Sequence, residues 1–227
     1  ILSGGLMSKF FFEVPQKQRI DVLGTLNEST TDVWIALHGY GQLVEYFQRH
    51  FRSMVTPARA FVFPQGAHKF YLQGTEGRVG ASWMTKEDRL IDIENQRLYL
   101  NEVCRWAFSE ATNARLHMVG FSQGVATGMR FLGHTTASFQ SLLAWAGSWP
   151  PDLEGRSQEA LKAMRISAWF GTKDPYVDQE KKQERCALYS QEFNLHPEVN
   201  TYEGAHSFDS NILASEIARL ELVTLEQ

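Results

Sequence analysis

The stretch LHMVGFSQGVATGMRFL, at residues 116–132, decides the fold of this chain. It opens with an apolar run typical of a buried β-strand and closes with a pattern typical of a helix. Between the two lies GFSQG at residues 120–124, a G-x-S-x-G sequence. A tight strand-to-helix turn of this kind exposes a serine hydroxyl at the edge of a sheet, and its glycines let backbone segments approach closely. Ser122 is therefore the candidate nucleophile; the alternative is a helix N-cap serine in a glycine-rich turn.

The composition is that of an ordinary soluble globular protein, with 43% hydrophobic and 21% charged residues among 227. A formal net charge of -4 provides no basic surface for nucleic acid, so we expect no nucleic-acid partner. No apolar run is long enough for a membrane-spanning helix, and we expect no stable membrane insertion. Cys104 and Cys186 lack the spacing of a zinc site and are expected to be free thiols. No metal or organic cofactor is expected.

Short apolar runs alternate with amphipathic stretches, which predicts an α/β fold with a mostly parallel sheet flanked by helices. We expect strands at residues 33–37, 60–63, 116–119, 142–146, 166–170 and 199–202, and an opening antiparallel pair at residues 10–14 and 20–26. We expect helices at residues 44–54, 91–111, 124–132, 157–163, 178–193 and 210–225. No Pro/Gly-rich linker divides the chain, so residues 1–227 are predicted to form a single domain.

A serine nucleophile needs a base and an orienting acid, which in this kind of fold follow it in the order acid, then histidine. His206 lies in a glycine turn, EGAHS, between the last predicted strand and the last helix, whereas His196 is expected in a surface loop. Asp174 directly follows the predicted strand ISAWF in the sequence GTKD. Asp178 is the alternative acid, and it also fits the N-cap of the next helix. The predicted catalytic residues are therefore Ser122, Asp174 and His206.

A tetrahedral oxyanion needs two backbone N–H donors, one after the nucleophile and one from a loop behind an early strand. The first is expected from Gln123. The second is expected from Tyr40, in the sequence HGYG that follows the predicted strand VWIAL. We expect His38 to brace this loop rather than to transfer protons. All these motifs follow predicted strands, at the sheet edge where open α/β sheets build their sites.

The stretch at residues 65–86 is long, glycine-rich and aromatic, with little periodicity, and we expect it to be a lid or binding loop. Three aromatic residues in this stretch and in later loops are candidates for the wall of an acyl pocket: Trp83, Trp149 and Tyr71. The alternative for each is ordinary core packing or an unremarkable surface position.

Together the motifs resemble those of the phospholipase/carboxylesterase family of α/β-hydrolases, which includes the acyl-protein thioesterases. LHGYGQ is similar to the family's L-H-G-x-G-D, GFSQG to its usual elbow, GTKDPYV to G-x-x-D-x-x-V and EGAHSF to its G-x-H turn. The resemblance runs from residue 33 to the C-terminus. It implies an α/β-hydrolase fold with little or no cap domain and hydrolysis of carboxylic ester or thioester bonds. It also places family roles on the triad Ser122, Asp174 and His206 and on the oxyanion positions Tyr40 and Gln123.

Three features depart from the family pattern. Gln42 stands where the family commonly has an acidic residue, Val125 stands where it has a second glycine, and residues 65–86 differ from the thioesterase version. These departures leave the triad intact and bear on substrate identity.

The sequence therefore predicts a serine carboxylesterase that hydrolyses short- to medium-chain carboxylic esters through an acyl-enzyme, with a small-molecule acyl ester as its partner. An acyl thioesterase or lysophospholipase on the same machinery is the alternative, and a non-catalytic binding protein on a hydrolase scaffold is a third. A homodimer is compatible with the sequence. We expect a cytoplasmic protein; a signal cleaved upstream of Ile1 remains open, because the chain does not begin with Met.

Overall fold

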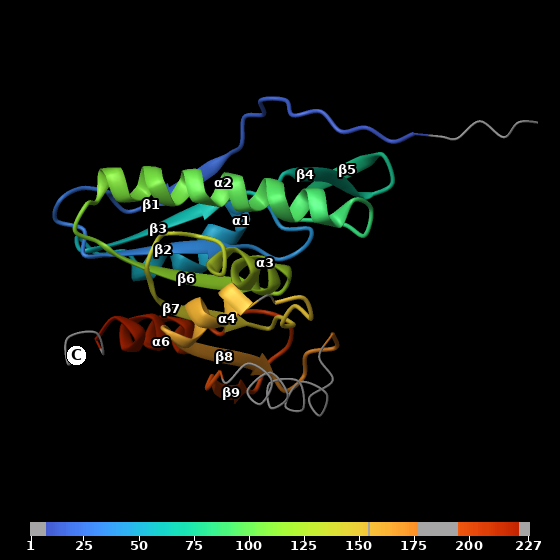
Figure 1. The fold of residues 1–227 in the computed structure, drawn as a ribbon. Helices are drawn as coiled ribbons and strands as arrows, with labels where there is room; N and C mark the ends of the chain where they lie inside the picture. The colour runs from blue at the N-terminus through green and yellow to red at the C-terminus, as the bar shows by residue number, and fades with distance from the viewer. Residues whose placement is uncertain (1–7, 154, 177–194, 223–227) are drawn as a thin grey trace, which may run out of the picture.

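A seven-stranded, mostly parallel sheet forms the centre of the protein. The computed structural model describes residues 8–153, 155–176 and 195–222. The strands lie in the order β1-β3-β2-β6-β7-β8-β9; β1 runs antiparallel to β3, and all other neighbours are parallel (Figure 1). Their bounds are β1 (Ile20–Leu23), β2 (Asp32–Leu37), β3 (Arg59–Pro64), β6 (Arg115–Phe121), β7 (Phe139–Trp145), β8 (Arg165–Gly171) and β9 (Glu198–Tyr202). The predicted fold class is confirmed.

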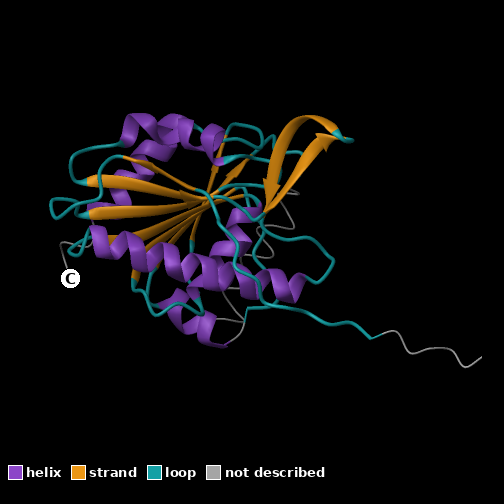
Figure 2. Cartoon of the chain, turned by 90° about the horizontal axis from the view of Figure 1, so that it is seen from above, coloured by secondary structure: helices purple, strands orange, loops and turns teal. Residues whose placement is uncertain are grey.

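Helices cover both faces of this sheet (Figure 2). One face carries α2 (Arg89–Glu110), α3 (Gln123–Leu132) and α4 (Gly155–Lys162), and the other carries α1 (Val44–Phe47), the 3-10 helix η1 (Gln48–Met54) and α6 (Ser210–Leu222). The helix predicted at residues 44–54 is thus split into a short α-helix and a 3-10 segment. The predicted helix at residues 178–193 lies outside the described residues.

Strand β2 shows why its sequence is a continuous apolar run. Val33, Ile35 and Leu37 pack into the core under α2 and α3, and Trp34 and Ala36 pack into the core under α1 and α6. All five side chains are fully buried. A parallel strand covered on both faces has no solvent side, and therefore no alternation of apolar and polar residues.

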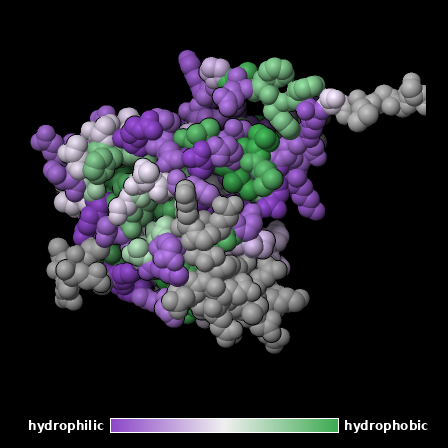
Figure 3. Space-filling model, in the orientation of Figure 1, coloured by the Kyte–Doolittle hydropathy of each residue, from purple (hydrophilic) through white to green (hydrophobic). Residues whose placement is uncertain are grey.

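The prediction of a strand at residues 10–14 is wrong. Residues 8–19 have no regular secondary structure, and Phe10 and Phe12 are 75% and 86% exposed. The other predicted member of the pair forms β1, which runs antiparallel to β3 and is shorter than predicted because Gly24 turns the chain with φ 88°. Residues 10–14 do not pair with β1, although β1 is the first strand in the sheet order, so an apolar run alone was not a sufficient signal for a strand. Figure 3 shows apolar groups at the surface along this N-terminal segment and over the start of α2.

Within the stretch at residues 65–86, predicted as an irregular loop, the structure has a β-hairpin. Strands β4 (His68–Gln73) and β5 (Glu76–Ser82) pair with each other and stand away from the main sheet (Figure 2). Gly74 and Gly77 adopt positive φ values of 59° and 84° at the turn, which glycine does at little steric cost. Most of β4 is exposed on both faces. This exposure explains why the sequence shows no alternation of apolar and polar residues there.

Cys104 is buried in α2 and free, and burial raises its thiol pKa to about 12. Cys186 lies outside the described residues. Within the described ranges, no helix is both long and apolar enough to cross a membrane.

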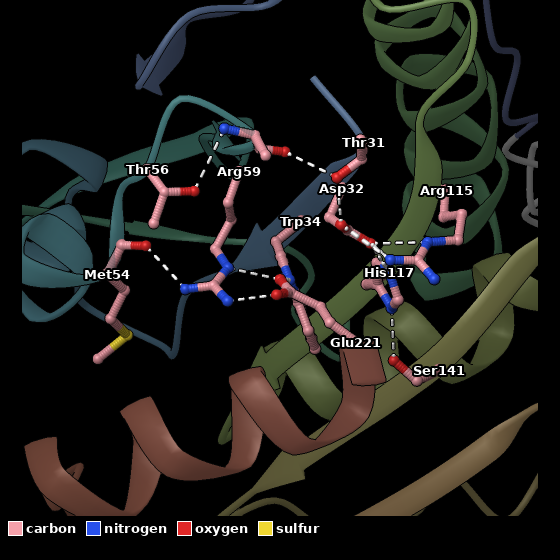
Figure 4. A network of polar contacts seen from close by, with 11 residues as sticks. Thr31, Asp32, Trp34, Met54, Thr56, Arg59, Arg115, His117, Ser141 and Glu221 are labelled. Carbon is pink, nitrogen blue, oxygen red and sulfur yellow. Dashed lines mark hydrogen bonds and ion pairs between the residues drawn. The ribbon is translucent and has the colours of Figure 1, made fainter. Parts of the chain in front are cut away.

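Two polar networks brace the end of the sheet where the parallel strands begin (Figure 4). In the first, Arg59 forms an ion pair with Glu221 of α6, and Arg59 Nη1 donates to Met54 O at 2.9 Å. Trp34 Nε1 also donates to Glu221, at 2.8 Å. This network joins β3, η1 and α6 through side chains that are largely removed from water.

The second network centres on the carboxylate of Asp32, which is 5% exposed. It accepts hydrogen bonds from Arg115 Nε at 2.9 Å and from His117 Nε2 at 3.0 Å, and the hydroxyl of Ser141 lies 2.8 Å from His117 Nδ1. Burial raises the pKa of Asp32, but the hydrogen bonds from His117, Arg115 and Thr31 outweigh it and lower the pKa to about 2. The folded state therefore favours the ionised carboxylate.

The depressed pKa of Asp32 predicts acid lability. The stabilisation is fully present above the ordinary pKa of 3.8 and is lost as the pH falls toward 2, a change of about 2 kcal/mol. We expect Asp32→Asn to lower the free energy of unfolding by about 3 kcal/mol at pH 7, and the deficit to shrink on acidification. Urea denaturation at several pH values measures both effects. The exposed Glu102, paired with Arg105, provides the control Glu102→Gln, whose stability should match the wild type; a pH-independent deficit in Asp32→Asn would contradict the assignment.

Candidate active site

Ser122 lies in a strained turn between β6 and α3. Its φ and ψ are 53° and -115°, a conformation that a residue with a side chain rarely adopts. The turn is held by hydrogen bonds from Ser122 N–H to Trp145 O at 2.9 Å and from Val125 N–H to Ser122 O at 3.1 Å. The sequence-predicted elbow is therefore present, with the serine half-buried at the edge where the parallel strands end.

The glycines of the elbow are required by close backbone contacts. A Cβ on Gly124 would lie 2.2 Å from Leu37 O, and one on Gly120 would lie 2.7 Å from the backbone of Val125. The departure at Val125 also has a packing explanation. Its Cγ2 would lie 2.3 Å from a Cβ on Gly147, so Val125 fills the space that Gly147 leaves open.

His206 and Asp174 contact each other directly. His206 Nδ1 donates to Asp174 Oδ2 at 2.6 Å, and Asp174 Oδ1 accepts the N–H of Tyr176 at 2.9 Å. The Asp174 side chain is fully buried, whereas that of His206 is 20% exposed. Because the carboxylate holds the proton on Nδ1, it leaves Nε2 of a neutral His206 as the ring's proton acceptor.

The His206 ring lies beside the elbow. Its centroid is 5.0 Å from the ring of Phe121, the residue before Ser122, and 4.9 Å from the exposed ring of Tyr176. Within the described residues, the Ser122 hydroxyl makes no hydrogen bond to His206. Such contacts are often long without substrate and tighten in the complex.

The HGYG loop is braced by His38, as expected. His38 Nδ1 donates to Gly39 O at 2.7 Å, and Nε2 accepts the N–H of Gly66 at 2.9 Å. Burial lowers the pKa of His38 to about 4, so the ring stays neutral. Trp83 stacks on the ring at 5.1 Å and donates its indole N–H to His38 O at 2.8 Å.

Gln42, the departure from the common acidic residue, also supports this loop. Its Oε1 accepts the N–H of Gly39 at 2.8 Å, the contact that a carboxylate at this position could make. A Cβ on Gly39 would lie 3.1 Å from the Cβ of Ser122, so the loop passes directly beside the serine. The base of the hairpin secures the loop from its other side through Gly41 N–H and Ala81 O at 2.8 Å.

The two expected oxyanion donors are available. Neither Tyr40 N–H nor Gln123 N–H has an acceptor among the described residues. The side chain of Gln123 has a separate role: it accepts the N–H of Trp83 at 3.0 Å and donates to Met84 O at 3.0 Å, so it ties α3 to the end of the hairpin. Sequence reasoning missed this contact because residues 83 and 123 are distant in the chain.

A family model described as Phospholipase/Carboxylesterase matches residues 25–223. The chain belongs to this family. No curated protein matches the chain in sequence. The family and the esterases among the structural neighbours support an ester hydrolase.

Solved structures of similar fold include esterases and a thioesterase. Esterase PE8 has a TM-score of 0.67 and 17% identity, over 90% of this chain and 100% of that one. Acyl-protein thioesterase 2 of Zea mays has a TM-score of 0.68 and 14% identity, over 90% and 99%. SOBER1 of Arabidopsis thaliana has a TM-score of 0.64 and 19% identity, over 85% and 100%. At these identities the likeness concerns the fold.

The three aromatics expected in the substrate pocket of this hydrolase lie in different settings. Trp83 and Trp149 are only 1% and 3% exposed and belong to the core, whereas Tyr71 on β4 is 51% exposed. Trp83 therefore packs in the core and supports the loop of His38, which agrees with the core-packing alternative for this residue. Tyr176, which the sequence analysis passed over, lies against His206 and is 80% exposed; its position two residues after Asp174 was the available signal.

The hydrolase contains a second Ser–His–Asp arrangement, in the network of Ser141, His117 and Asp32. Ser141 and His117 are fully buried and Asp32 is 5% exposed, so no substrate reaches them. Burial, and not residue type, separates this arrangement from the one at Ser122.

The remaining expectations concern alternatives and metals. His196 is exposed, as expected for a surface loop, and Asp178 lies outside the described residues. In the described part of the chain, no group of three or more His, Cys, Asp or Glu side chains could hold a metal ion.

The steric contact at Gly124 predicts the cost of a single methyl group. Gly124→Ala should lower the free energy of unfolding by about 3 kcal/mol, because the new Cβ meets backbone that cannot move aside. Gly74→Ala is the control: it has a positive φ of 59° but nothing within 4 Å, and should cost only about 1 kcal/mol. Urea denaturation measures both; equal losses would contradict the steric explanation.

Proposed function

We propose that this family member is a serine carboxylesterase that hydrolyses short- to medium-chain carboxylic esters through an acyl-enzyme. The observation that carries the proposal is the 2.6 Å contact between His206 Nδ1 and Asp174 Oδ2, beside the strained turn of Ser122. A buried carboxylate that orients a partly exposed histidine at the edge of such a turn is the arrangement that activates a serine hydroxyl.

The reaction proceeds in two steps. Ser122 Oγ attacks the acyl carbon while its proton passes to Nε2 of His206, and Asp174 stabilises the imidazolium that forms. His206 then returns the proton to the departing alcohol, which leaves an acyl group on Ser122. In the second step a water molecule gives a proton to His206 and attacks the acyl-enzyme, and the carboxylic acid is released as Ser122 regains its proton.

The developing oxyanion is held by the N–H groups of Tyr40 and Gln123. Their freedom from other acceptors in the described chain supports this role. Each such donor is worth about 3 kcal/mol of transition-state stabilisation, because it is already oriented before the charge develops.

Exposed aromatic rings border the proposed site on two sides. Tyr40, 60% exposed, packs against Phe70 of the hairpin at 5.0 Å, and Tyr176 covers one side of His206. Tyr71 is the member of the expected pocket set with an exposed ring; it follows Phe70 on β4, so its side chain points to the opposite face of the hairpin. Such surfaces suit an uncharged acyl ester rather than a charged substrate.

Ser122→Ala should abolish activity. We expect kcat for p-nitrophenyl butyrate at pH 8 to fall by about 10⁴-fold or more, because the nucleophile is lost. Labelling of the protein by a fluorophosphonate should also disappear. The matched control is Ser141→Ala, which removes the serine of the buried arrangement and should keep both activity and labelling. Full activity in Ser122→Ala, or an inert wild type, would overturn the proposal.

The chain-length profile separates the two hydrolase alternatives. We expect kcat/KM for p-nitrophenyl esters, measured from acetate to palmitate, to be highest at short to medium length. Parallel assays with acyl thioesters of the same lengths provide the comparison. A preference for long-chain thioesters would contradict the carboxylesterase assignment and favour the thioesterase alternative on the same residues.

A further inference from the structure

The backbone on both sides of His206 is held by side chains from two neighbouring strands. The hydroxyl of Tyr202, at the end of β9, bonds Ala205 O at 2.9 Å and also contacts Ser207 O. Trp145 Nε1, from the end of β7, donates to Ser207 O at 3.0 Å and lies 3.2 Å from the Tyr202 hydroxyl. The two carbonyls that flank His206 therefore converge on one hydroxyl and one indole N–H.

Trp145 also holds the nucleophile. Its backbone carbonyl accepts the N–H of Ser122 at 2.9 Å, because it lies opposite Phe121 in the pairing of β6 with β7. The same residue thus contacts the turn of Ser122 with its backbone and the loop of His206 with its side chain. Its indole is fully buried and stacks on Trp169 at 5.7 Å, which fixes its position.

We propose that Trp145 and Tyr202 form a clamp that sets the distance between Ser122 and His206. The proposal rests on the proposed function, since it concerns proton transfer between these two residues. Tyr202 is 6% exposed and Trp145 fully buried, so both act as positioning residues and not through substrate contact. The Ser122 hydroxyl and His206 share no hydrogen bond within the described residues. Their approach therefore depends on how firmly the two segments are held.

The test is Tyr202→Phe, which removes the hydroxyl and keeps the ring in its place against Trp145. We expect kcat to fall at least about tenfold, since small misplacements of reacting groups cost this much or more. KM should change less than about twofold, because the residue does not touch substrate. The pH dependence of kcat/KM should also shift, because the environment of His206 changes. Labelling of Ser122 by a fluorophosphonate should slow by a factor similar to that of kcat.

The matched control is Tyr99→Phe. Tyr99 lies on α2, and its hydroxyl bonds a backbone carbonyl, Arg19 O, at 2.8 Å. Both variants therefore lose a tyrosine hydroxyl that bonds backbone carbonyl oxygen, but only the Tyr202 hydroxyl contacts the loop of His206, at Ala205 O and Ser207 O. Tyr99→Phe should keep the wild-type kcat, pH profile and labelling rate.

A second variant, Trp145→Phe, should lower kcat in the same direction, and its effect should not add to that of Tyr202→Phe, since both act on Ser207 O. Unchanged kcat and pH profile in folded Tyr202→Phe would overturn the clamp, even if its thermal stability fell. That outcome leaves the proposed function intact as long as the wild type is labelled and Ser122→Ala is not. A wild type that is not labelled would overturn both proposals.

Discussion

The close approach of Gly124 to the carbonyl of Leu37 is the contact on which the site depends. It lets the first turn of α3 pack against the end of β2, and so brings the end of β6 beside the HGYG loop. The positive φ of Ser122 is the backbone cost of that turn. The surrounding contacts, among them the bond from Ser122 N–H to Trp145 O, stabilise this strained conformation. Strain at functional sites commonly persists in this way, because the surrounding structure holds it in place.

The same edge of the sheet collects the other functional groups for a topological reason. Strands β2, β6, β7 and β8 are parallel neighbours, so the residues that follow them lie at one end. Asp174 follows β8, and His206 follows β9, the next strand out. The opposite end carries the networks of Asp32 and Arg59, whose buried and half-buried charges join strands, helix and 3-10 segment. One end thus provides an accessible site, and the other provides polar bracing without access.

The two Ser–His–Asp arrangements show how far residue type alone can mislead. Ser141, His117 and Asp32 have the groups and nearly the distances of a catalytic set. They lie within the sheet, where neighbouring strands and packed helices exclude substrate. Ser122 differs because a turn, and not a strand, carries it. Accessibility is a property of the packed protein, and the sequence indicates it here only through the glycines that a tight turn requires.

The sequence by itself determined the parallel sheet, the elbow at Ser122 and the likeness to the phospholipase/carboxylesterase family. These follow from local rules: strand-length apolar runs, and glycines that backbone crowding demands. It failed for residues 10–14, because an apolar run is not sufficient for a strand, and for the hairpin at β4 and β5, because exposed strands lack a periodic pattern. Only the tertiary structure decided that Trp83 is a buried brace, and that Trp145 and Tyr202 hold the loop of His206. The contacts of Trp83 and Trp145 join residues 45 to 62 positions apart, and only the packed fold brings such residues within hydrogen-bonding distance.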